Sequence, residues 1–412
     1  MDMHPANEIR GAISSELDGR TVLLGVTGSS AAYKAIDLAR QLIRRGARVI
    51  PILSRKAAEF VSPTLFHWAT GEKPVTSLGG EVEHITLARL STGMIVAPAT
   101  LKTMVGIATG YASNALVATA VVMNSMGKPV VVAPAMHVQL WRSPQCRKAL
   151  EMLREEGYVV IPPVERDGRL VLPDPRDLAR VSTAIFLRGR DLEGFRIVVT
   201  AGAAREFIDS VRFISNPSTG RMGVEIATEA YARGATALLV AGHLEVSVPP
   251  WIPVVTVTST QEMLDAVLRA VKNVRPHALV MAAAPCDYRP AKRFSGKIDS
   301  RAVERVELEL VRNPKIVKEV RRVYDGVLIM FAAEPVSRAE ECEERAKAKL
   351  EEAGADAIIA NPILSERAGF GKATNEVLVI TRDGRKMVWG PEPKEVIARR
   401  IIDLVRDLVR AS

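Results

Sequence analysis

One arrangement of residues occurs twice in this chain of 412 residues, and it constrains the fold more than any other feature. A short apolar run at 22–26 leads into a loop of small residues, then a helical pattern, and then a second apolar run at 49–53. Residues 197–240 repeat this plan with a longer loop before the helix. Strand, glycine-containing loop, helix and strand form a βαβ unit, and short, wholly apolar strands are typical of a parallel sheet. The sequence therefore predicts two α/β domains, each a doubly wound, Rossmann-like parallel sheet.

The two domains are expected to meet near residue 188, because 187–194 is charged, contains glycine and lacks an apolar period. We therefore assign one domain to residues 1–188 and the other to 189–412. Further apolar runs predict strands in the first domain at 93–98, 130–134 and 158–161, with helices at 35–45, 102–122 and 144–156. In the second domain they predict strands near 253–257, 278–283, 306–310, 327–333, 356–360 and 376–381, with helices near 260–273, 337–353 and 393–410.

Composition narrows the choice of partners. The net charge of +9 is spread along the chain and only 5% of residues are aromatic, so we expect anionic small molecules as partners and no nucleic acid. No apolar run approaches the roughly 20 residues that a membrane helix needs, so no membrane partner is expected. The three cysteines are too widely spaced for a metal knuckle or a disulfide framework, and we expect no protein-bound metal cluster and a cytoplasmic location.

The first chemical motif is the loop Gly28–Ser29–Ser30, which follows a strand and precedes a helix. Backbone N–H groups, hydroxyls and the helix dipole converge at such a place, and the spacing suits a monophosphate better than a pyrophosphate. A tight turn that needs small residues is the alternative interpretation. Three more segments, 97–100, 112–114 and 134–137, are expected at strand ends.

These segments are parts of longer motifs: TGSSAAYK, EHITLARLSTGMIVAPAT, YASNALVATA and PAMHVQLW, in that order within residues 20–160. The motifs resemble those of the flavin-containing cysteine decarboxylases, among which the domain is most similar to phosphopantothenoylcysteine decarboxylase. The resemblance implies a flavodoxin-like fold that binds FMN. It carries the FMN contacts over to Gly28, Ser29, Ser30, Ser54, Ala97, Thr100 and Asn114.

The same resemblance implies two catalytic histidines. His84, expected in a loop before a strand, matches the family's proton-handling histidine, although a structural histidine is the alternative. His137 stands where the family has an Asn that binds the substrate carboxylate. Bound FMN would supply the oxidation of the substrate thiol that permits loss of CO2. The family's flap carries a proton-donating Cys, whereas 164–173 contains none; Cys146 is the nearest thiol, and a buried position is expected for it.

The second half resembles phosphopantothenate-cysteine ligase, from VTAGAAREFIDSVRFISNPSTGRMG through MAAAPCDYRP, NPKIV and FAAE. By this resemblance Asn216 and Arg212 handle an acyl-nucleotide intermediate, and Lys297 is catalytic. The implied nucleotide contacts are Met281, Ala282, Ala283, Asp287, Lys297, Pro314, Lys315, Ile316, Val317, Phe331, Arg345 and Lys349.

Together the two halves resemble the bifunctional coenzyme A biosynthesis proteins. The resemblance implies phosphopantothenate and cysteine as substrates, CTP rather than ATP as co-substrate, and Mg²⁺ on its phosphates. It also implies a homo-oligomer, with trimers of the first domain joined by dimers of the second. Two alternatives stay open: an FMN-binding regulatory or scaffold protein without decarboxylase activity, and a flavin prenyltransferase-like enzyme.

Three of these cations are predicted to form a triphosphate clamp. Lys297 lies in a basic loop with Gly, Ser and Pro, while Arg345 and Lys349 stand four residues apart on one helix face. The alternative is that Arg345 forms a solvated ion pair with Glu341.

Overall fold

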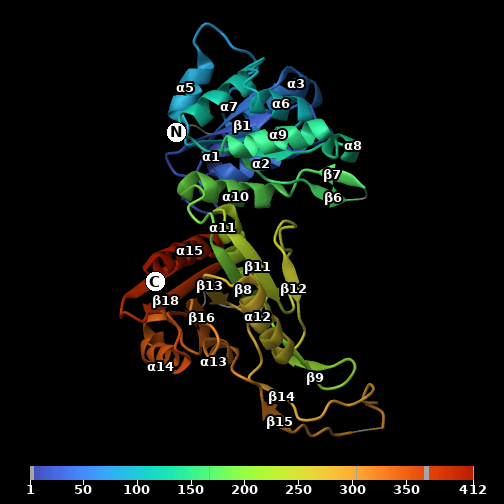
Figure 1. Cartoon of the computed structure of the whole chain (residues 1–412), viewed down its shortest axis with the longest axis vertical. Helices are drawn as coiled ribbons and strands as arrows, with labels where there is room; N and C mark the ends of the chain where they lie inside the picture. Colours follow the sequence, from blue (N-terminus) through green and yellow to red (C-terminus); the bar gives the residue numbers. More distant parts are fainter. Residues whose placement is uncertain (1–3, 167, 303, 366–370, 412) are drawn as a thin grey trace. The chain divides into compact units, whose positions relative to one another are not determined.

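In the computed structural model the chain forms two compact units, Met1–Gly189 and Arg190–Ser412 (Figure 1). The structure describes residues 4–166, 168–302, 304–365 and 371–411. Each unit has its own β-sheet with helices on both faces.

The N-terminal unit is built on a five-stranded sheet of order β2-β1-β3-β4-β5, in which every pair of neighbours is parallel. Its strands are β1 (Thr21–Val26), β2 (Arg48–Leu53), β3 (Gly93–Ala99), β4 (Val130–Pro134) and β5 (Val159–Val160). This is the flavodoxin-like order, in which the chain leaves β1 toward one edge and returns to the other side at β3. The predicted fold of this half is confirmed, and a ligand site is expected where β1 and β3 end.

Helices cover both faces of this sheet. One face carries α5 (Glu83–Leu90), α6 (Leu101–Ala108), α7 (Ala115–Ser125) and α9 (Pro144–Glu155), which share an apolar core with the strands. On the other side α2 (Lys34–Ile43) packs against α10 (Pro175–Arg188). The shorter elements are α1 (Pro5–Glu8), η1 (Ser30–Tyr33), α3 (Arg55–Phe60), α4 (Pro63–Thr70), α8 (Val138–Trp141) and the hairpin of β6 (Val164–Arg166) and β7 (Arg169–Val171).

The single helix predicted over 102–122 is wrong, because two helices occupy this stretch. Gly110 adopts φ +68° just after α6, a conformation that ends a helix. Asn114 then caps α7, since its Oδ1 accepts the N–H of Val117 at 3.1 Å. Segment 112–114 therefore lies between two helices and not at a strand end as expected.

The C-terminal unit is built on an eight-stranded sheet of order β12-β11-β8-β13-β16-β17-β18-β19. Six strands are parallel: β8 (Arg196–Ala201), β11 (Thr236–Ala241), β12 (Val254–Thr256), β13 (Ala278–Met281), β16 (Val327–Glu334) and β17 (Ala357–Pro362). In chain order they follow the 3-2-1-4-5-6 pattern of the dinucleotide-binding fold, with the switch point between β8 and β13. The predicted doubly wound α/β class is confirmed for this unit as well.

Three details of this sheet differ from the prediction. An antiparallel hairpin of β18 (Thr374–Thr381) and β19 (Lys386–Pro393) extends its edge. Strand β19 was not predicted, because its sequence carries two prolines and an apolar run of three residues, 387–389. No sheet strand forms at 306–310; instead β15 (Leu310–Arg312) pairs with β14 (Tyr288–Pro290) as a separate ribbon. A second ribbon, β9 (Arg205–Phe207) with β10 (Phe213–Ser215), follows β8.

Two apolar cores lie on opposite faces of this sheet. One contains α11 (Arg221–Ala232) and α15 (Lys394–Ala411), so the C-terminal amphipathic helix packs on the sheet as its pattern predicts. The other contains α12 (Thr260–Val274), α13 (Ile316–Arg321), η2 (Ala339–Cys342) and α14 (Glu343–Ala353).

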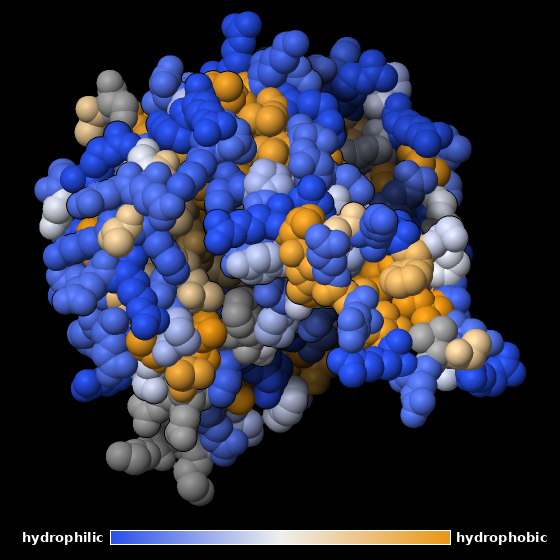
Figure 2. All heavy atoms as spheres, turned by 90° about the horizontal axis from the view of Figure 1, so that it is seen from below, coloured by the Kyte–Doolittle hydropathy of each residue, from blue (hydrophilic) through white to orange (hydrophobic). Residues whose placement is uncertain are grey.

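Polar and apolar residues are mixed on the surface face that Figure 2 shows. In Figure 2 the apolar atoms form separate patches among polar ones on the face that is shown. Among the residues that the structure describes, no helix has both the length and the apolar character to cross a membrane.

Candidate functional site

In the N-terminal unit, the predicted phosphate loop lies at the sheet's switch point. Thr27, directly after β1, joins this loop to the end of β3: its Oγ1 donates to the carbonyl of Pro98 at 2.7 Å and accepts the N–H of Thr100 at 3.0 Å. Ser54 lies beside them, because its N–H bonds to the carbonyl of Val26 at 3.0 Å. The structure thus brings Gly28, Ser29, Ser30, Ser54 and Thr100 to one edge of the sheet.

Glycine is required at position 28 by close packing. A Cβ there would lie 2.6 Å from the Cβ of Lys56 and 3.3 Å from its carbonyl carbon, so any side chain would displace the start of α3. The serines have local roles as well: Ser29 caps η1 by accepting the N–H of Ala31, and Ser54 caps α3 by accepting that of Ala57. These hydroxyls sit at helix starts, where an anion is favoured.

The other two predicted FMN contacts are placed differently. Ala97 is fully buried inside β3, so its side chain packs in the core and only its backbone is near the end of the strand. The side-chain oxygen of Asn114 is engaged in capping α7, and its amide nitrogen lies 3.5 Å from Ser113 Oγ. A contact from the Asn114 side chain to a flavin would therefore use its amide nitrogen, Nδ2.

His84 lies in the first turn of α5 and not in a loop, so that expectation is wrong. The helix starts there because Glu83 accepts the N–H of Gly79 with both carboxylate oxygens and the backbone turns at Val82, with φ +53°. The Nδ1 atom of His84 is buried and has no hydrogen-bond partner among the described residues. Burying a polar atom without a hydrogen-bond partner costs free energy of folding, and a bound ligand could supply the missing partner.

His137 is exposed and caps the short helix α8, with its Nδ1 accepting the N–H of Gln139 at 3.3 Å. Its neighbour Met136 forms a β-bridge with Leu170 in the β6–β7 hairpin, which is the region expected to be the flap. Lys34 ties the same flap to the start of α2 through the carbonyl of Leu172, at 3.4 Å. Cys146 is buried in α9, as expected, and the sequence of the flap contains no cysteine.

In the C-terminal unit several of the predicted residues lie where β8 and β13 end. Asn216 donates from its Nδ2 to the carbonyl of Pro285 at 2.9 Å, which links the long loop after β8 to the loop after β13. Ala283 is held by the hydroxyl of Thr200, which accepts its N–H at 3.0 Å. Met281 is buried at the end of β13, followed by the half-buried Ala282.

The segment 313–317 lies against this loop. Lys315 pairs with Asp287 at 2.6 Å, and the N–H of Asn313 bonds to the carbonyl of Asp287 at 2.9 Å. Pro314 precedes α13, whose first residues are Ile316 and Val317. The ion pair is two-thirds exposed, so it adds little stability and both charges remain accessible to a ligand.

Asn313 and Glu206 were not predicted as site residues. Asn313 Nδ2 donates to Glu206 Oε1 at 3.0 Å and to the carbonyl of Cys286 at 2.9 Å, all of them buried. Glu206 also accepts the N–H of Thr260 at 2.9 Å. The sequence motif NPKIV includes Asn313, but only the fold shows that the side chain of this residue binds the 313–317 segment to the loop that follows β13.

Arg345 and Lys349 converge on a buried carboxylate. Glu334, the last residue of β16, is 1% exposed and accepts from Lys349 Nζ at 2.5 Å, with Arg345 Nη1 at 3.9 Å. The alternative pair of Arg345 with Glu341 does not form, because Glu341 pairs with Arg338 at 2.8 Å. Phe331 also lies in β16, next to Met330, which pairs with Met281 of β13.

Lys297 is exposed in the loop between β14 and β15. Arg345 and Lys349 share Glu334, whereas no hydrogen bond or ion pair between described residues links Lys297 to that carboxylate. The loop does meet the segment of Arg212: Arg212 Nη1 lies 3.3 Å from the carbonyl of Ile298.

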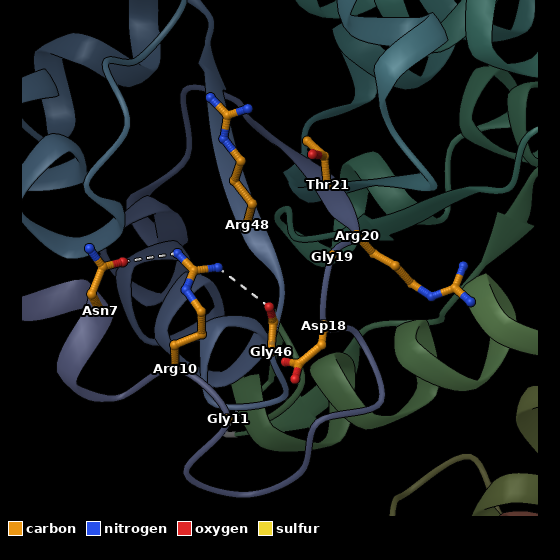
Figure 3. Close-up of a pocket in the computed structure, with 9 residues that line it drawn as sticks. All are labelled: Asn7, Arg10, Gly11, Asp18, Gly19, Arg20, Thr21, Gly46 and Arg48. Atoms are coloured by element: carbon orange, nitrogen blue, oxygen red, sulfur yellow. Dashed lines mark hydrogen bonds between the residues drawn. The ribbon is translucent and has the colours of Figure 1, made fainter. Parts of the chain in front are cut away.

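A cavity of about 690 Å³ lies elsewhere in the N-terminal unit, lined by Asn7, Arg10, Gly11, Asp18, Gly19, Arg20, Thr21, Gly46 and Arg48 (Figure 3). Thr21 and Arg48 are the first residues of β1 and β2, so this cavity opens at the amino ends of the strands. It is therefore at the opposite edge of the sheet from the predicted FMN contacts. Its lining includes Arg10, which donates to Asn7 and to the carbonyl of Gly46.

Comparison with known proteins divides the chain into the same two parts as the structure does, close to residue 189. Residues 10–184 match the family "Flavoprotein", and residues 192–408 match "DNA/pantothenate metabolism flavoprotein C-terminal domain". The chain is 34% identical over 414 residues to the coenzyme A biosynthesis bifunctional protein CoaBC of Thermococcus kodakarensis, covering 99% of this chain and 100% of that protein. The chain belongs to the CoaBC family. The CoaBC protein of Bacillus subtilis is 33% identical over 385 residues, covering 90% of this chain and 92% of that protein.

Solved structures similar to the chain cover one unit or the other. The C-terminal domain of a CoaBC protein is 32% identical, with a TM-score of 0.46, and covers 54% of this chain and 100% of that one. A PPC decarboxylase mutant complexed with pantothenoylaminoethenethiol is 23% identical, with a TM-score of 0.38, and covers 41% of this chain and 98% of that one.

Proposed function

We propose that this CoaBC family member catalyses two steps of coenzyme A biosynthesis. The C-terminal unit joins phosphopantothenate to cysteine, and the N-terminal unit decarboxylates the product to phosphopantetheine. The observation that carries this proposal is the match of both units, in this order and over nearly the whole chain, to bifunctional relatives. A regulatory FMN-binding protein or a flavin prenyltransferase would leave residues 192–408 unexplained.

The N-terminal unit is proposed to bind one FMN. Gly28, Ser29 and Ser30 would hold its phosphate together with Ser54 and Thr100, since the fold places these five residues at one edge of the sheet. The dense packing around Gly28 and the partnerless Nδ1 of His84 fit a preformed site for a ligand. When bound, FMN would supply a two-electron oxidation of the substrate thiol that makes loss of CO2 possible, and would return the same two electrons to the decarboxylated product, so that no external oxidant is consumed.

The protein's own part in that step falls to two histidines. His84 is proposed to take up or return a proton through its partnerless ring nitrogen, because an imidazole can act both as a general base and as a general acid. His137 would bind the substrate carboxylate through Nε2, since its Nδ1 caps α8. The β6–β7 hairpin, tied to Met136 beside it, would cover the bound substrate.

The C-terminal unit is proposed to use CTP. Met281, Ala282, Ala283, Asp287 and the segment 314–317 would surround the nucleoside, with Phe331 next to them. The carboxylate of phosphopantothenate attacks the α-phosphate and pyrophosphate leaves; the amine of cysteine then attacks the acyl carbon and releases CMP. Cations stabilise the negative charge that spreads over the phosphates in the first step, and we assign this role to Lys297, Arg345 and Lys349.

Arg212 and Asn216 are proposed to bind the acyl-nucleotide, since both lie between β8 and α11. There Asn216 contacts the loop after β13, and Arg212 contacts the loop that carries Lys297. Mg²⁺ is proposed to bind with the nucleotide. The described residues include no group of three or more His, Cys, Asp or Glu side chains able to hold a metal, so the ion's ligands would be mainly phosphate oxygens and water. We further propose a cytoplasmic homo-oligomer, with trimers of the first domain and dimers of the second.

The test is Lys297→Gln. Pyrophosphate release from phosphopantothenate and CTP, measured before cysteine is added, should fall at least about tenfold, as expected for the loss of one charged hydrogen bond. FMN content and CO2 release from supplied phosphopantothenoylcysteine should stay at the wild-type level, because Lys297 belongs to the other unit. Lys292→Gln, in the same exposed basic loop, is the matched control. Wild-type pyrophosphate release in Lys297→Gln would contradict the assignment of the nucleotide site.

A further inference from the structure

The loop that carries Lys297 is fastened to the segment after β9. Phe294 donates its N–H to the carbonyl of Ile208 at 2.9 Å, and Ser210 donates to the carbonyl of Gly296 at 3.4 Å. The guanidinium of Arg293 stacks over the ring of Phe207, 4.9 Å from its centre. Residues 293–298 therefore run alongside residues 207–210.

Asp209 lies at the centre of this contact. Its side chain is wholly buried, and its carboxylate accepts four hydrogen bonds. Oδ1 accepts the N–H of Val211 at 2.7 Å and that of Arg212 at 2.6 Å. Oδ2 accepts Arg212 Nη1 at 2.6 Å and the N–H of Ile298, the residue directly after Lys297, at 3.1 Å.

The two oxygens thus have different tasks. Oδ1 closes a local turn within 209–212, whereas Oδ2 joins that turn to a loop 89 residues further along the chain. Arg212 reinforces the junction, since its Nη1 also lies 3.3 Å from the carbonyl of Ile298. The backbone N–H of Arg212, above all, holds the pKa of Asp209 far below its usual range, so the carboxylate is charged at neutral pH.

We propose that Asp209 is a positioning residue of the ligase: its Oδ2 fixes the guanidinium of Arg212 and the backbone next to Lys297 in one arrangement before the nucleotide binds. This inference rests on the proposed function, because it assumes that Arg212 and Lys297 act on the acyl-nucleotide and the triphosphate. An exposed loop would otherwise sample many conformations, and ordering it on each binding event would cost free energy. A displacement of about 1 Å in such a group can slow a reaction roughly a hundredfold.

Asp209→Asn separates the two tasks. The amide oxygen can still accept the N–H groups of Val211 and Arg212, which preserves the local turn. The amide nitrogen then faces Ile298 N–H and Arg212 Nη1, donor against donor, so the junction with the loop is lost. Asp299→Asn is the matched control, because the hydrogen bonds that the Asp299 side chain accepts from described residues come from Arg301 within the same loop.

Two readouts are expected to move in the full-length flavoprotein. The rate constant for pyrophosphate release from phosphopantothenate and CTP should fall about ten- to a hundredfold in Asp209→Asn, while Asp299→Asn stays within twofold of wild type. Trypsin should also cleave the loop near Arg293 and Lys297 several times faster in Asp209→Asn, without added ligand. CO2 release from supplied phosphopantothenoylcysteine should remain at the wild-type level in both variants.

A double variant tests whether Asp209 acts through Lys297. In the Lys297→Gln background, Asp209→Asn should lower the rate constant for pyrophosphate release by a factor several times smaller than it does in the wild-type background. If the two effects simply multiply, or if Asp209→Asn releases pyrophosphate at the wild-type rate while Lys297→Gln is impaired, the inference is overturned and the proposed function stands. If Lys297→Gln itself is unimpaired, the nucleotide assignment fails and the inference fails with it. Should Asp209→Asn not fold, Ile298→Pro removes the same bond from the loop side and is expected to give the same loss.

Discussion

Gly223 offers a test of how closely the ligase site depends on the packing of α11 against β8. A Cβ at this position would lie 2.6 Å from the Cβ of Ala201 and 2.7 Å from the carbonyl oxygen of Thr200. Carbon atoms in contact are normally about 3.5–4.0 Å apart, so Gly223→Ala forces the helix away from the strand by about 1 Å. Because both neighbours are backbone or Cβ atoms, no side-chain rotation can relieve the overlap.

Two opposing effects set the magnitude. Alanine favours a helix over glycine by about 1 kcal/mol, whereas overpacking costs about 1–3 kcal/mol. We expect a net loss of about 1 kcal/mol, which lowers the melting temperature of a unit of this size by about 2–4 °C. Pyrophosphate release should fall more than this loss of stability explains, since α11 begins at the end of the loop that carries Asn216.

Scanning calorimetry and the pyrophosphate assay provide the measurement, with Gly106→Ala as the control. Gly106 is also helical, but its added Cβ would meet nothing closer than 3.4 Å, so that variant should be neutral or slightly more stable. A Gly223→Ala protein that is as stable as wild type and fully active as a ligase would refute the packing argument.

Three further predictions concern other parts of the chain. His84→Asn should keep FMN bound and abolish CO2 release, whereas His137→Asn should keep at least part of the activity; flavin absorbance and CO2 assays decide, and an active His84→Asn would contradict its role. Burial raises the pKa of the Cys286 thiol to about 11, so at pH 8 it is protonated and should react slowly with a disulfide reagent until the protein is denatured; rapid labelling of the native protein would count against this. Arg399→Met removes the 3.0 Å partner of the buried carboxylate of Glu229, which still faces Arg233 at 3.9 Å. The free energy of unfolding should fall by about 1.5–3 kcal/mol in urea titrations, and a loss below about 0.5 kcal/mol would show that the pair is dispensable.

The sequence predicted correctly those structural features that depend on residues close together in the chain. Apolar runs and glycine stops predicted the parallel strands of both sheets, because strands buried on both faces must be apolar throughout. Three motif segments of the first half were predicted at strand ends, which is correct for 97–100 and 134–137 and wrong for 112–114. Residue types and their spacing are therefore sufficient to predict the parallel strands and most of the first-half motif positions.

What the sequence could not supply depends on contacts between distant segments. Glu334 is one of many acidic residues in its region, and only the fold shows it buried between Lys349 and Arg345. Asp209 and Ile298 are 89 residues apart, so no local pattern predicts their hydrogen bond. The helix break at Gly110 did have a local signal, since Gly is typical of a helix end and Ser113–Asn114 of a helix start; the apolar runs on either side of 109–114 nevertheless suggested one continuous helix.

The central claim is that one chain carries both activities, and a single assay tests it most directly. The purified flavoprotein is given phosphopantothenate, cysteine, CTP and Mg²⁺, and pyrophosphate and CO2 are counted separately over the same time course. We predict that pyrophosphate appears first and that CO2 follows in equal final amount. Release of pyrophosphate without CO2 from a protein saturated with FMN, or of neither product, would contradict the account.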